Sequence, residues 1–187
     1  MSKFDPDNAD HLDSKERRER LAPDDIFSLL DIEKNDTVLD FGAGTGFLTF
    51  PISRRLTDGK VYAVDVQEEM LDKLRKKCQE NGCKNIEVLL NEEGCIPIKD
   101  GEIDKAFLIN VLHEIDDEAT FEELYRVINE GGKMCVVDWD KEGETSHGPP
   151  ASKRFPLKEA IELLERYGFA PIKSYKNKHH FFVSFQK

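Results

Sequence analysis

The chain has 187 residues, of which 39% are hydrophobic and 35% charged, and its formal net charge is −11. A chain of this size buries one sizeable core without cross-links, so we predict a single domain over residues 1–187. The strong acidity excludes a protein that holds DNA or RNA by a broad basic face, and we expect no nucleic-acid partner.

The chain carries no apolar run of about 18 residues, so we expect no membrane span. The segment from Met1 to Asp10 is polar and lacks the apolar stretch of a signal peptide. The four cysteines lack Cys-x-x-Cys spacing and are expected to stay reduced: Cys78, Cys83, Cys95 and Cys135. These features together predict a cytoplasmic protein.

The first 30 residues come before any strand pattern. Residues 14–21 are charged and helix-prone, and a second short helix is expected from Pro23, where proline and two acids occupy the first turn. We predict that residues 1–30 form a helical lid segment and that an α/β core follows over residues 36–187.

Residues 38–48 read as a strand, a tight turn and the start of a helix. Three glycines, Gly42, Gly44 and Gly46, allow backbone conformations that side chains forbid and let a ligand approach the main chain. A helix that begins near Gly46 would add unpaired N–H groups and a positive dipole end. The turn is therefore a predicted ligand-binding site.

The spacing of these glycines distinguishes two classes of ligand. Dinucleotide-binding turns have the pattern G-x-G-x-x-G, whereas this turn is G-x-G-x-G with Phe47 in the place of the third dinucleotide glycine. With Asp40 two residues before the first glycine, the stretch resembles motif I of the class I S-adenosylmethionine-dependent methyltransferases. The resemblance implies S-adenosyl-L-methionine as the cofactor.

Strand and helix patterns alternate after the turn and end in a hairpin. The expected helices, in chain order, are 47–56, one that has Met70, Leu71, Leu74 and Cys78 on a single face and ends at Asn81-Gly82, 117–128 and 157–167. The expected strands are 60–65, 85–90, 103–109, 135–139, 171–175 and 180–185. Gly131 and Gly132 are expected to end the third of these helices. The pattern predicts a Rossmann-like, doubly wound, seven-stranded α/β sheet, mostly parallel with one antiparallel strand near the C-terminus and helices on both faces.

An acid ends the second predicted strand, 19 positions beyond Gly46: Asp65 is in the place that binds ribose hydroxyls in nucleoside-binding α/β folds. The resemblance further places Glu92 at the adenine amine, although Asn91-Glu92 stands where Gly-Asp is usual, and a solvated loop acid is the alternative. The predicted cofactor-binding residues are Asp40, Gly42, Ala43, Gly44, Gly46, Asp65, Val66, Met70, Glu92, Glu93 and Asn110.

His113 and Glu114 follow the fourth strand and are the predicted catalytic residues, with His113 as proton acceptor; the alternative is that His113 only orders its loop. Residues 125–132 resemble the R-V-L-x-P-G-G signature of small-molecule methyltransferases, and the chain is most similar to the ubiquinone/menaquinone-biosynthesis type. We therefore expect a monomeric or homodimeric methyltransferase with a small-molecule acceptor and no metal. The alternatives are an NAD-linked oxidoreductase and a cofactor-binding, catalytically silent regulatory subunit.

Residues 140–155 form a polar stretch with two glycines and two prolines, longer than a simple connection. A methyl-transfer site must exclude water, and the predicted strands supply only the cofactor side. This stretch and the N-terminal segment are therefore expected to close over the acceptor. The alternative is a surface extension and a tether to the final hairpin.

Overall fold

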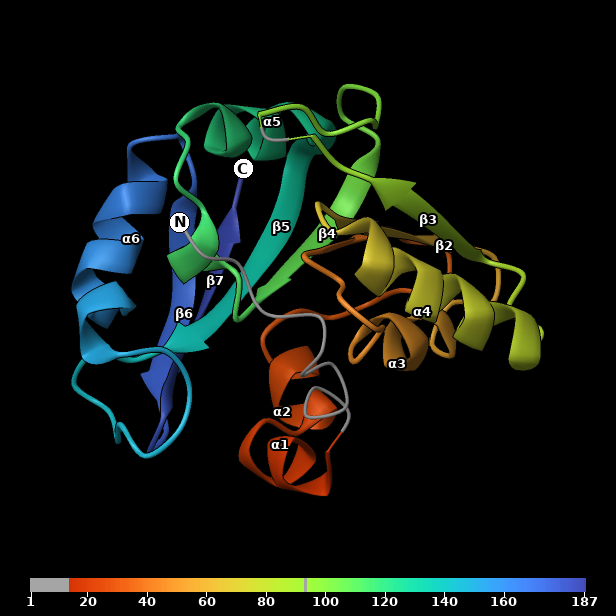
Figure 1. Cartoon of the computed structure of the whole chain (residues 1–187). Coiled ribbons are helices and arrows are strands. Elements are labelled where there is room, and N and C mark those ends of the chain that lie inside the picture. Colours follow the sequence, from red (N-terminus) through yellow and green to blue (C-terminus); the bar gives the residue numbers. More distant parts are fainter. Residues whose placement is uncertain (1–13, 93) are drawn as a thin grey trace.

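The computed structural model describes residues 14–92 and 94–187, and the chain forms one seven-stranded sheet in the order β3-β2-β1-β4-β5-β7-β6 (Figure 1). The strands are β1 Thr37–Phe41, β2 Lys60–Asp65, β3 Ile86–Leu90, β4 Ile103–Ile109, β5 Ile128–Trp139, β6 Ala170–Lys176 and β7 His180–Gln186. Strand β7 is antiparallel to both of its neighbours, and the strands from β3 to β5 pair in parallel. The predicted fold is confirmed.

Helices cover both faces of the sheet: α1 Lys15–Arg20, α2 Pro23–Phe27, α3 Thr49–Ser53, α4 Glu68–Glu80, α5 Ala119–Val127 and α6 Leu157–Glu165. Because side chains alternate along a strand, Val38 of β1 packs with α2 and α3, whereas Leu39 packs with α5 and α6. Figure 1 shows the sheet between α6 on one side and α3 and α4 on the other.

Helix α3 is much shorter than the predicted helix over residues 47–56. It begins at Thr49, three residues after Gly46, and has five residues. Pro51 lies in this helix and has no N–H to donate to the Phe47 carbonyl, a hydrogen bond that a helix beginning at Phe47 would need. The expectation of a helix N-terminus at Gly46 is therefore wrong. The backbone N–H groups that a ligand could meet here are those of the turn.

Strand β5 begins at Ile128, seven residues before the predicted start. Ile103 pairs with Ile128 and Lys105 pairs with Lys133, so residues 129–132 form a bulge on β5. Gly131 has a φ of 80°, a conformation that suits glycine in such a bulge. The prediction that the two glycines end a helix is wrong, because α5 ends at Val127 and the glycines lie within the strand.

Among the described helices, the longest has 13 residues and none has the length and apolar character needed to span a bilayer. All four cysteines are free. The described residues contain no group of three or more side chains placed to hold a metal ion.

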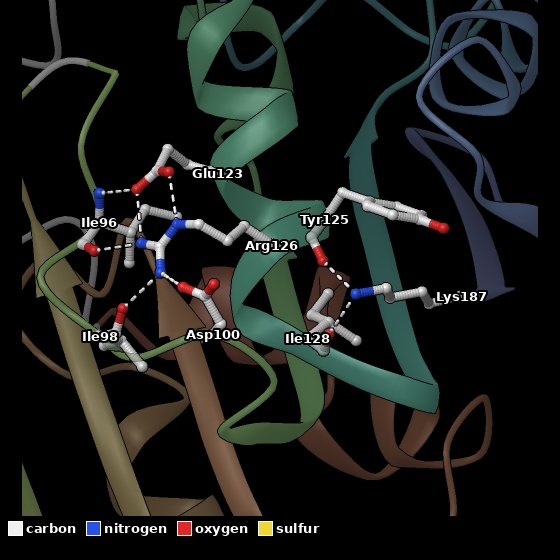
Figure 2. A network of polar contacts seen from close by, with 8 residues as sticks. All are labelled: Ile96, Ile98, Asp100, Glu123, Tyr125, Arg126, Ile128 and Lys187. Carbon is white, nitrogen blue, oxygen red and sulfur yellow. Dashed lines mark hydrogen bonds and ion pairs between the residues drawn. The ribbon is translucent and has the colours of Figure 1, made fainter.

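Arg126 of α5 holds the loop between β3 and β4 in place (Figure 2). Its guanidinium donates to the carbonyl oxygens of Ile96 and Ile98, both at 2.9 Å. Glu123 accepts two further hydrogen bonds from Arg126 at 2.6 Å and also accepts one from the Ile96 amide. The Glu123 carboxylate raises the pKa of Arg126, so this cation stays charged under all working conditions.

The same part of Figure 2 shows how the C-terminal residue is attached to the end of α5. The Lys187 ammonium donates to the carbonyl oxygens of Tyr125 and Ile128, both at 2.8 Å. The Tyr125 carbonyl lies in the last turn of α5, where carbonyl groups lack partners within the helix, so the Lys187 ammonium satisfies one such acceptor.

Replacing Arg126 with alanine is expected to lower the free energy of unfolding by about 1.5–3 kcal/mol, because charge-assisted hydrogen bonds to two backbone carbonyls and to the Glu123 and Asp100 carboxylates are lost. Urea unfolding of wild type and variant measures this. Lys158→Ala is the control, since its ion pair with Glu162 is exposed and is expected to contribute less than about 0.5 kcal/mol. Equal effects of both substitutions would contradict the anchoring role.

Candidate functional site

A cavity of about 690 Å³ lies at the carboxyl ends of the central strands. It is lined by the turn after β1, by the ends of β2, β4 and β5, by α1, and by residues 147–150. Strands β1 and β4 are adjacent but far apart in sequence, and such a switch point is where open parallel sheets bind ligands. The cavity is therefore the candidate site.

Packing requires glycine at two positions of the turn, Gly42 and Gly46. A Cβ on Gly42 would lie 2.3 Å from Val111 Cγ2, and a Cβ on Gly46 would lie 2.6 Å from Leu74 Cδ1. Gly46 lies behind the turn and is absent from the cavity lining, whereas Gly42, Ala43 and Gly44 line it. Both Gly42 and Gly46 have positive φ, so a side chain at either position would be strained as well as crowded.

Asp65 ties the end of β2 to the glycine turn. Its Oδ2 accepts a hydrogen bond from the Gly44 amide at 2.8 Å, and its Oδ1 accepts one from the Gln67 amide at 3.0 Å. A carboxylate accepts about four hydrogen bonds, so ligand hydroxyls can be added to these two. Val66 and Met70 line the same end of the cavity.

Asp40 is buried beneath the turn and is absent from the cavity lining. The Thr49 hydroxyl donates to Asp40 Oδ2 at 2.5 Å. Burial raises the pKa of Asp40 to about 6, and the Thr49 hydrogen bond opposes this only in part. A carboxyl group that ionises near pH 6 beneath a ligand-binding turn costs stability when it is charged.

Replacing Asp40 with asparagine removes this cost. Because the pKa of Asp40 is higher in the folded state, its contribution to stability is lost as the pH rises from about 4 through about 6. The unfolding free energy of Asp40→Asn minus that of wild type is expected to rise by about 2 kcal/mol between about pH 4 and about pH 7. Urea unfolding across this range measures it, with the exposed Asp58→Asn as control; a flat difference for Asp40→Asn would contradict the assignment.

Asn91 directly follows β3, whose last residue pairs with Asp65 at the end of β2. It is buried, its amide donates to the Asp65 carbonyl at 2.8 Å, and its Oδ1 has no hydrogen-bond partner among the described residues. Its neighbour Glu92 is exposed and outside the cavity lining, because a short bridge to Cys95 turns it outward. The prediction for Glu93 lies outside the described residues.

Asn110 directly follows β4 and has a φ of 59°, a left-handed conformation that is uncommon for residues other than glycine but that asparagine tolerates. Its amide donates to the Val137 carbonyl at 2.8 Å, and its Oδ1 has no partner among the described residues. Two buried amide oxygens, those of Asn91 and Asn110, are thus available to donors of a ligand in the same cavity.

His113 lies in a short 3₁₀ helix, Leu112–Glu114, and is held by Asp138 at the end of β5. His113 Nδ1 lies 2.7 Å from Asp138 Oδ1, and the His113 amide donates to Asp138 Oδ2 at 3.2 Å. Burial by itself would lower the pKa of His113, but the Asp138 carboxylate outweighs it and the pKa is raised above its ordinary value. Glu114 Oε1 lies 3.8 Å from His113 Nε2.

Asp138 is a site residue that the sequence patterns missed. The signal was its position, because an acid next to the last residue of a parallel strand lies at the edge where ligands bind. With Nδ1–H donating to Asp138, the neutral imidazole of His113 has its lone pair on Nε2. His113 and Glu114 both line the cavity.

The side of the cavity away from the turn is covered by α1 and by the loop after β5. The Arg17 guanidinium of α1 lies 4.3 Å from the ring centroid of Phe47, which lines the cavity. Arg154 is buried and shapes the loop, since it donates to the carbonyl oxygens of Glu144, His147 and Pro149. Residues of both segments expected to form a lid line the cavity: residues 14–21 of the first and residues 147–153 of the second contribute to it. Residues 1–13 of the predicted lid lie outside the described residues.

The chain matches the model of the family described as "Methyltransferase domain" over residues 38–132. It is also similar to a crystal structure of a SAM-dependent methyltransferase from Aquifex aeolicus, with 34% identity and a TM-score of 0.93. That similarity covers 98% of this chain and 99% of the other.

Curated relatives include a demethylmenaquinone methyltransferase of Lactococcus lactis, 33% identical over 130 residues, and an arsenite methyltransferase of Halobacterium salinarum, 33% identical over 107 residues. These alignments cover 68% and 55% of this chain. The chain spans 47% and 27% of the lengths of these two relatives.

Proposed function

Because this chain belongs to the methyltransferase-domain family, we propose that it transfers a methyl group from S-adenosylmethionine to a small-molecule acceptor. The observation that carries the proposal is that one cavity is lined by the glycine turn, by Asp65, by Asn91 and Asn110, whose amide oxygens have no partner among the described residues, and by His113, which is paired with Asp138. The glycine turn, Asp65 and the two amide oxygens suit a nucleoside with a charged amino-acid tail. The His113–Asp138 pair suits removal of a proton.

The cofactor end of the cavity fits the chemistry of S-adenosylmethionine. Asp65 would accept the ribose hydroxyls, and Asn91 Oδ1 would accept a hydrogen from the adenine amine. The backbone of Gly42 and Gly44 would lie against the amino-acid tail, with Asn110 Oδ1 near its ammonium group. Asp40 does not line the cavity, so it would affect the ligand only by the charge of its carboxylate, acting across the glycine turn.

When bound, S-adenosylmethionine would supply an electrophilic methyl group, and its sulfur would leave with the electron pair of the sulfur–methyl bond as the acceptor takes up the methyl group. The acceptor atom loses its proton to His113 Nε2, and the imidazolium is stabilised by Asp138 until it releases the proton to solvent. Glu114 lies close enough to assist this release. The remaining task of the protein is to position the two reactants and exclude water.

The presence of His113 as a proton acceptor limits the chemistry of the molecule that accepts the methyl group. None of the four cysteines is among the described residues that line the cavity, so a soft acceptor such as arsenite would find no thiol ligand there. A buried imidazole whose orientation is set by a carboxylate is instead useful to an acceptor that has a proton to lose. We therefore propose an O–H, N–H or acidic C–H acceptor.

We further propose that the protein is cytoplasmic, acts as a monomer or homodimer and does not bind nucleic acid. The net charge of −11 and the four free cysteines support it. Thermal unfolding tests the ligand: S-adenosylhomocysteine is expected to raise the melting temperature, whereas NADH is not. A methyl-transfer screen with labelled S-adenosylmethionine over small-molecule pools then identifies the acceptor, and stabilisation by NADH alone would overturn the proposal.

We also propose that residues 14–30 and 140–155 form the lid of this site. Support comes from the lining of the cavity, to which both segments contribute, and from α1, in which no residue is buried. Asn177 Nδ2 donates to the Arg20 carbonyl at 3.4 Å on the surface, a long hydrogen bond that permits α1 to open. The residues after α1 stay anchored, because four of their side chains are buried in the core: Leu21, Ile26, Leu29 and Leu30.

Hydrogen exchange tests the lid. S-adenosylhomocysteine is expected to slow amide exchange at least about threefold in residues 14–21 and 144–148, because a ligand that binds the closed state lowers the fraction of open molecules. Exchange in the edge strand β6 is the internal control and is expected to stay unchanged. Equal exchange with and without ligand in both segments would contradict the lid.

A further inference from the structure

The turn that ends α4 brings two cysteines together. Helix α4 ends at Glu80, and Gly82 follows with a φ of 62°. The Cys83 amide donates to the Cys78 carbonyl at 3.0 Å, and the Gly82 amide donates to the Gln79 carbonyl at 3.3 Å. These two hydrogen bonds are those of a Schellman motif, in which the side chains of the first and last residues meet. In this chain those two residues are Cys78 and Cys83.

Both cysteines are free and partly buried. Cys78 packs against the cluster that contains Leu71 and Leu74 of the same helix. Burial raises the pKa of Cys78 to about 11, and the neighbouring Cys83 thiol contributes to this. A disulfide needs Cα atoms that are roughly 4.4–6.8 Å apart, and the direct hydrogen bond between the two backbones is compatible with that spacing.

Cys83 also lines a second cavity, of about 540 Å³. Residues 56–57 and 81–85, which lead into β2 and β3, contribute to its lining, so it lies at the opposite edge of the sheet from the candidate site. Its lining includes Arg54 and Lys84, both exposed and without an ion pair among the described residues. None of the described residues that line it is acidic, although the whole chain has a formal net charge of −11. The cavity therefore suits an anionic molecule beside Cys83.

We propose that Cys78 and Cys83 form a reversible disulfide by exchange with a small anionic disulfide that binds beside Arg54 and Lys84. The Cys83 thiolate attacks one sulfur of the small disulfide, which forms a mixed disulfide and releases one small thiolate. The Cys78 sulfur then attacks the Cys83 sulfur and releases the second small thiolate. The two protein thiols are oxidised to one disulfide, the small disulfide is reduced to two thiols, and these take up the two protons that the cysteines lose.

The order of the two steps follows from the surroundings of the cysteines. Cys83 lines the cavity and meets the small disulfide, whereas Cys78 does not line it. The high pKa of Cys78 leaves little thiolate, but its attack is intramolecular, and proximity compensates for a small reactive fraction. No residue of this site lines the candidate methyl-transfer site, so the proposal does not rest on the proposed function.

Two probes test the site: oxidised glutathione, which is anionic, and hydroxyethyl disulfide, which is neutral. The reduced protein is mixed with each probe, quenched with acid, alkylated and mapped by peptide mass spectrometry. Cys95 is the internal comparison, because it is more exposed than Cys83 and lies outside the cavity. The preference for oxidised glutathione over hydroxyethyl disulfide is expected to be at least about tenfold greater at Cys83 than at Cys95. The Cys78–Cys83 disulfide is expected as the end product, whereas Cys95 keeps its glutathione adduct.

Charge variants test the cavity. Arg54→Gln combined with Lys84→Gln is expected to lower the preference of Cys83 for oxidised glutathione at least about fivefold, because the two cations nearest to the bound anion are lost. Lys73→Gln combined with Lys76→Gln is the matched control, since it removes two exposed cations of α4 that do not line the cavity. The control is expected to change the preference less than about twofold.

Cys78→Ala is expected to stop the reaction at the glutathione adduct of Cys83. A Cys83 adduct that persists in wild type would overturn the disulfide, and an equal probe preference at Cys83 and Cys95 would overturn the anionic partner. Should Cys78→Ala not fold, the masses of the wild-type peptides decide between the disulfide and the adduct. Either failure leaves the binding of S-adenosylhomocysteine, and with it the proposed function, unaffected.

Discussion

Replacing Asp65 with alanine is expected to weaken the binding of S-adenosylhomocysteine by roughly 10- to 150-fold. This corresponds to about 1.5–3 kcal/mol, the usual loss when hydrogen bonds to a charged group are removed. The structure adds a second reason, because Asp65 also accepts the amide hydrogens of Gly44 and Gln67 and so holds the turn against which the ligand would lie. Calorimetric titration measures the affinity.

Substitutions of Asn91 and Glu92, which are adjacent after β3, show which of the two binds the adenine amine. Asn91→Ala is expected to weaken binding about tenfold, because Asn91 Oδ1 is buried in the cavity wall without a partner among the described residues. Glu92→Ala is the control and is expected to change affinity less than twofold, because Glu92 is exposed outside the cavity. A larger loss for Glu92→Ala than for Asn91→Ala would return the adenine contact to the acid that the sequence pattern predicts.

Replacing His113 with asparagine is expected to lower turnover on the true acceptor by about 10²- to 10⁴-fold, the usual contribution of a general base. Asp138→Asn is expected to lower turnover by at least about 10²-fold, because an amide no longer selects the tautomer with its lone pair on Nε2. Both variants are expected to bind S-adenosylhomocysteine within about threefold of wild type. Steady-state kinetics and calorimetry together measure this.

The pH profile separates a base from a residue that only orders its loop. In wild type, kcat/KM is expected to rise with pH through a pKa above the ordinary value for histidine, because Asp138 raises the pKa of His113. In Asp138→Asn the inflection is expected to move to lower pH, since the charge that favours the imidazolium is gone. A purely structural His113 would leave the profile flat in both proteins while lowering turnover.

The order of the elements and the cofactor end of the site could be predicted from the sequence. Strands β2 and β4 have the predicted ends almost to the residue, because apolar runs bounded by turn residues are local properties of the chain. The sequence also predicts that Asp65 and the glycine turn belong to one binding site, because their spacing is that of a single strand–helix–strand unit. The start of β5 could not be predicted, since the bulge at residues 129–132 depends on the pairing of β5 with β4. Pro51, in contrast, is a local feature that the sequence shows, and it disfavours a helix that begins at Phe47.

The acceptor end of the cavity was decided by tertiary structure alone. Asp138 meets His113 because β5 lies beside β4, and the two residues are 25 positions apart in sequence. His180 reaches the same edge because β7 runs antiparallel, and Arg154 shapes the loop opposite through backbone carbonyls that carry no sequence signal. The sequence by itself determined the motifs in which neighbouring residues act together, because their geometry is set by local periodicity. Contacts between distant residues depend on strand order and direction, which exist only once the sheet has formed.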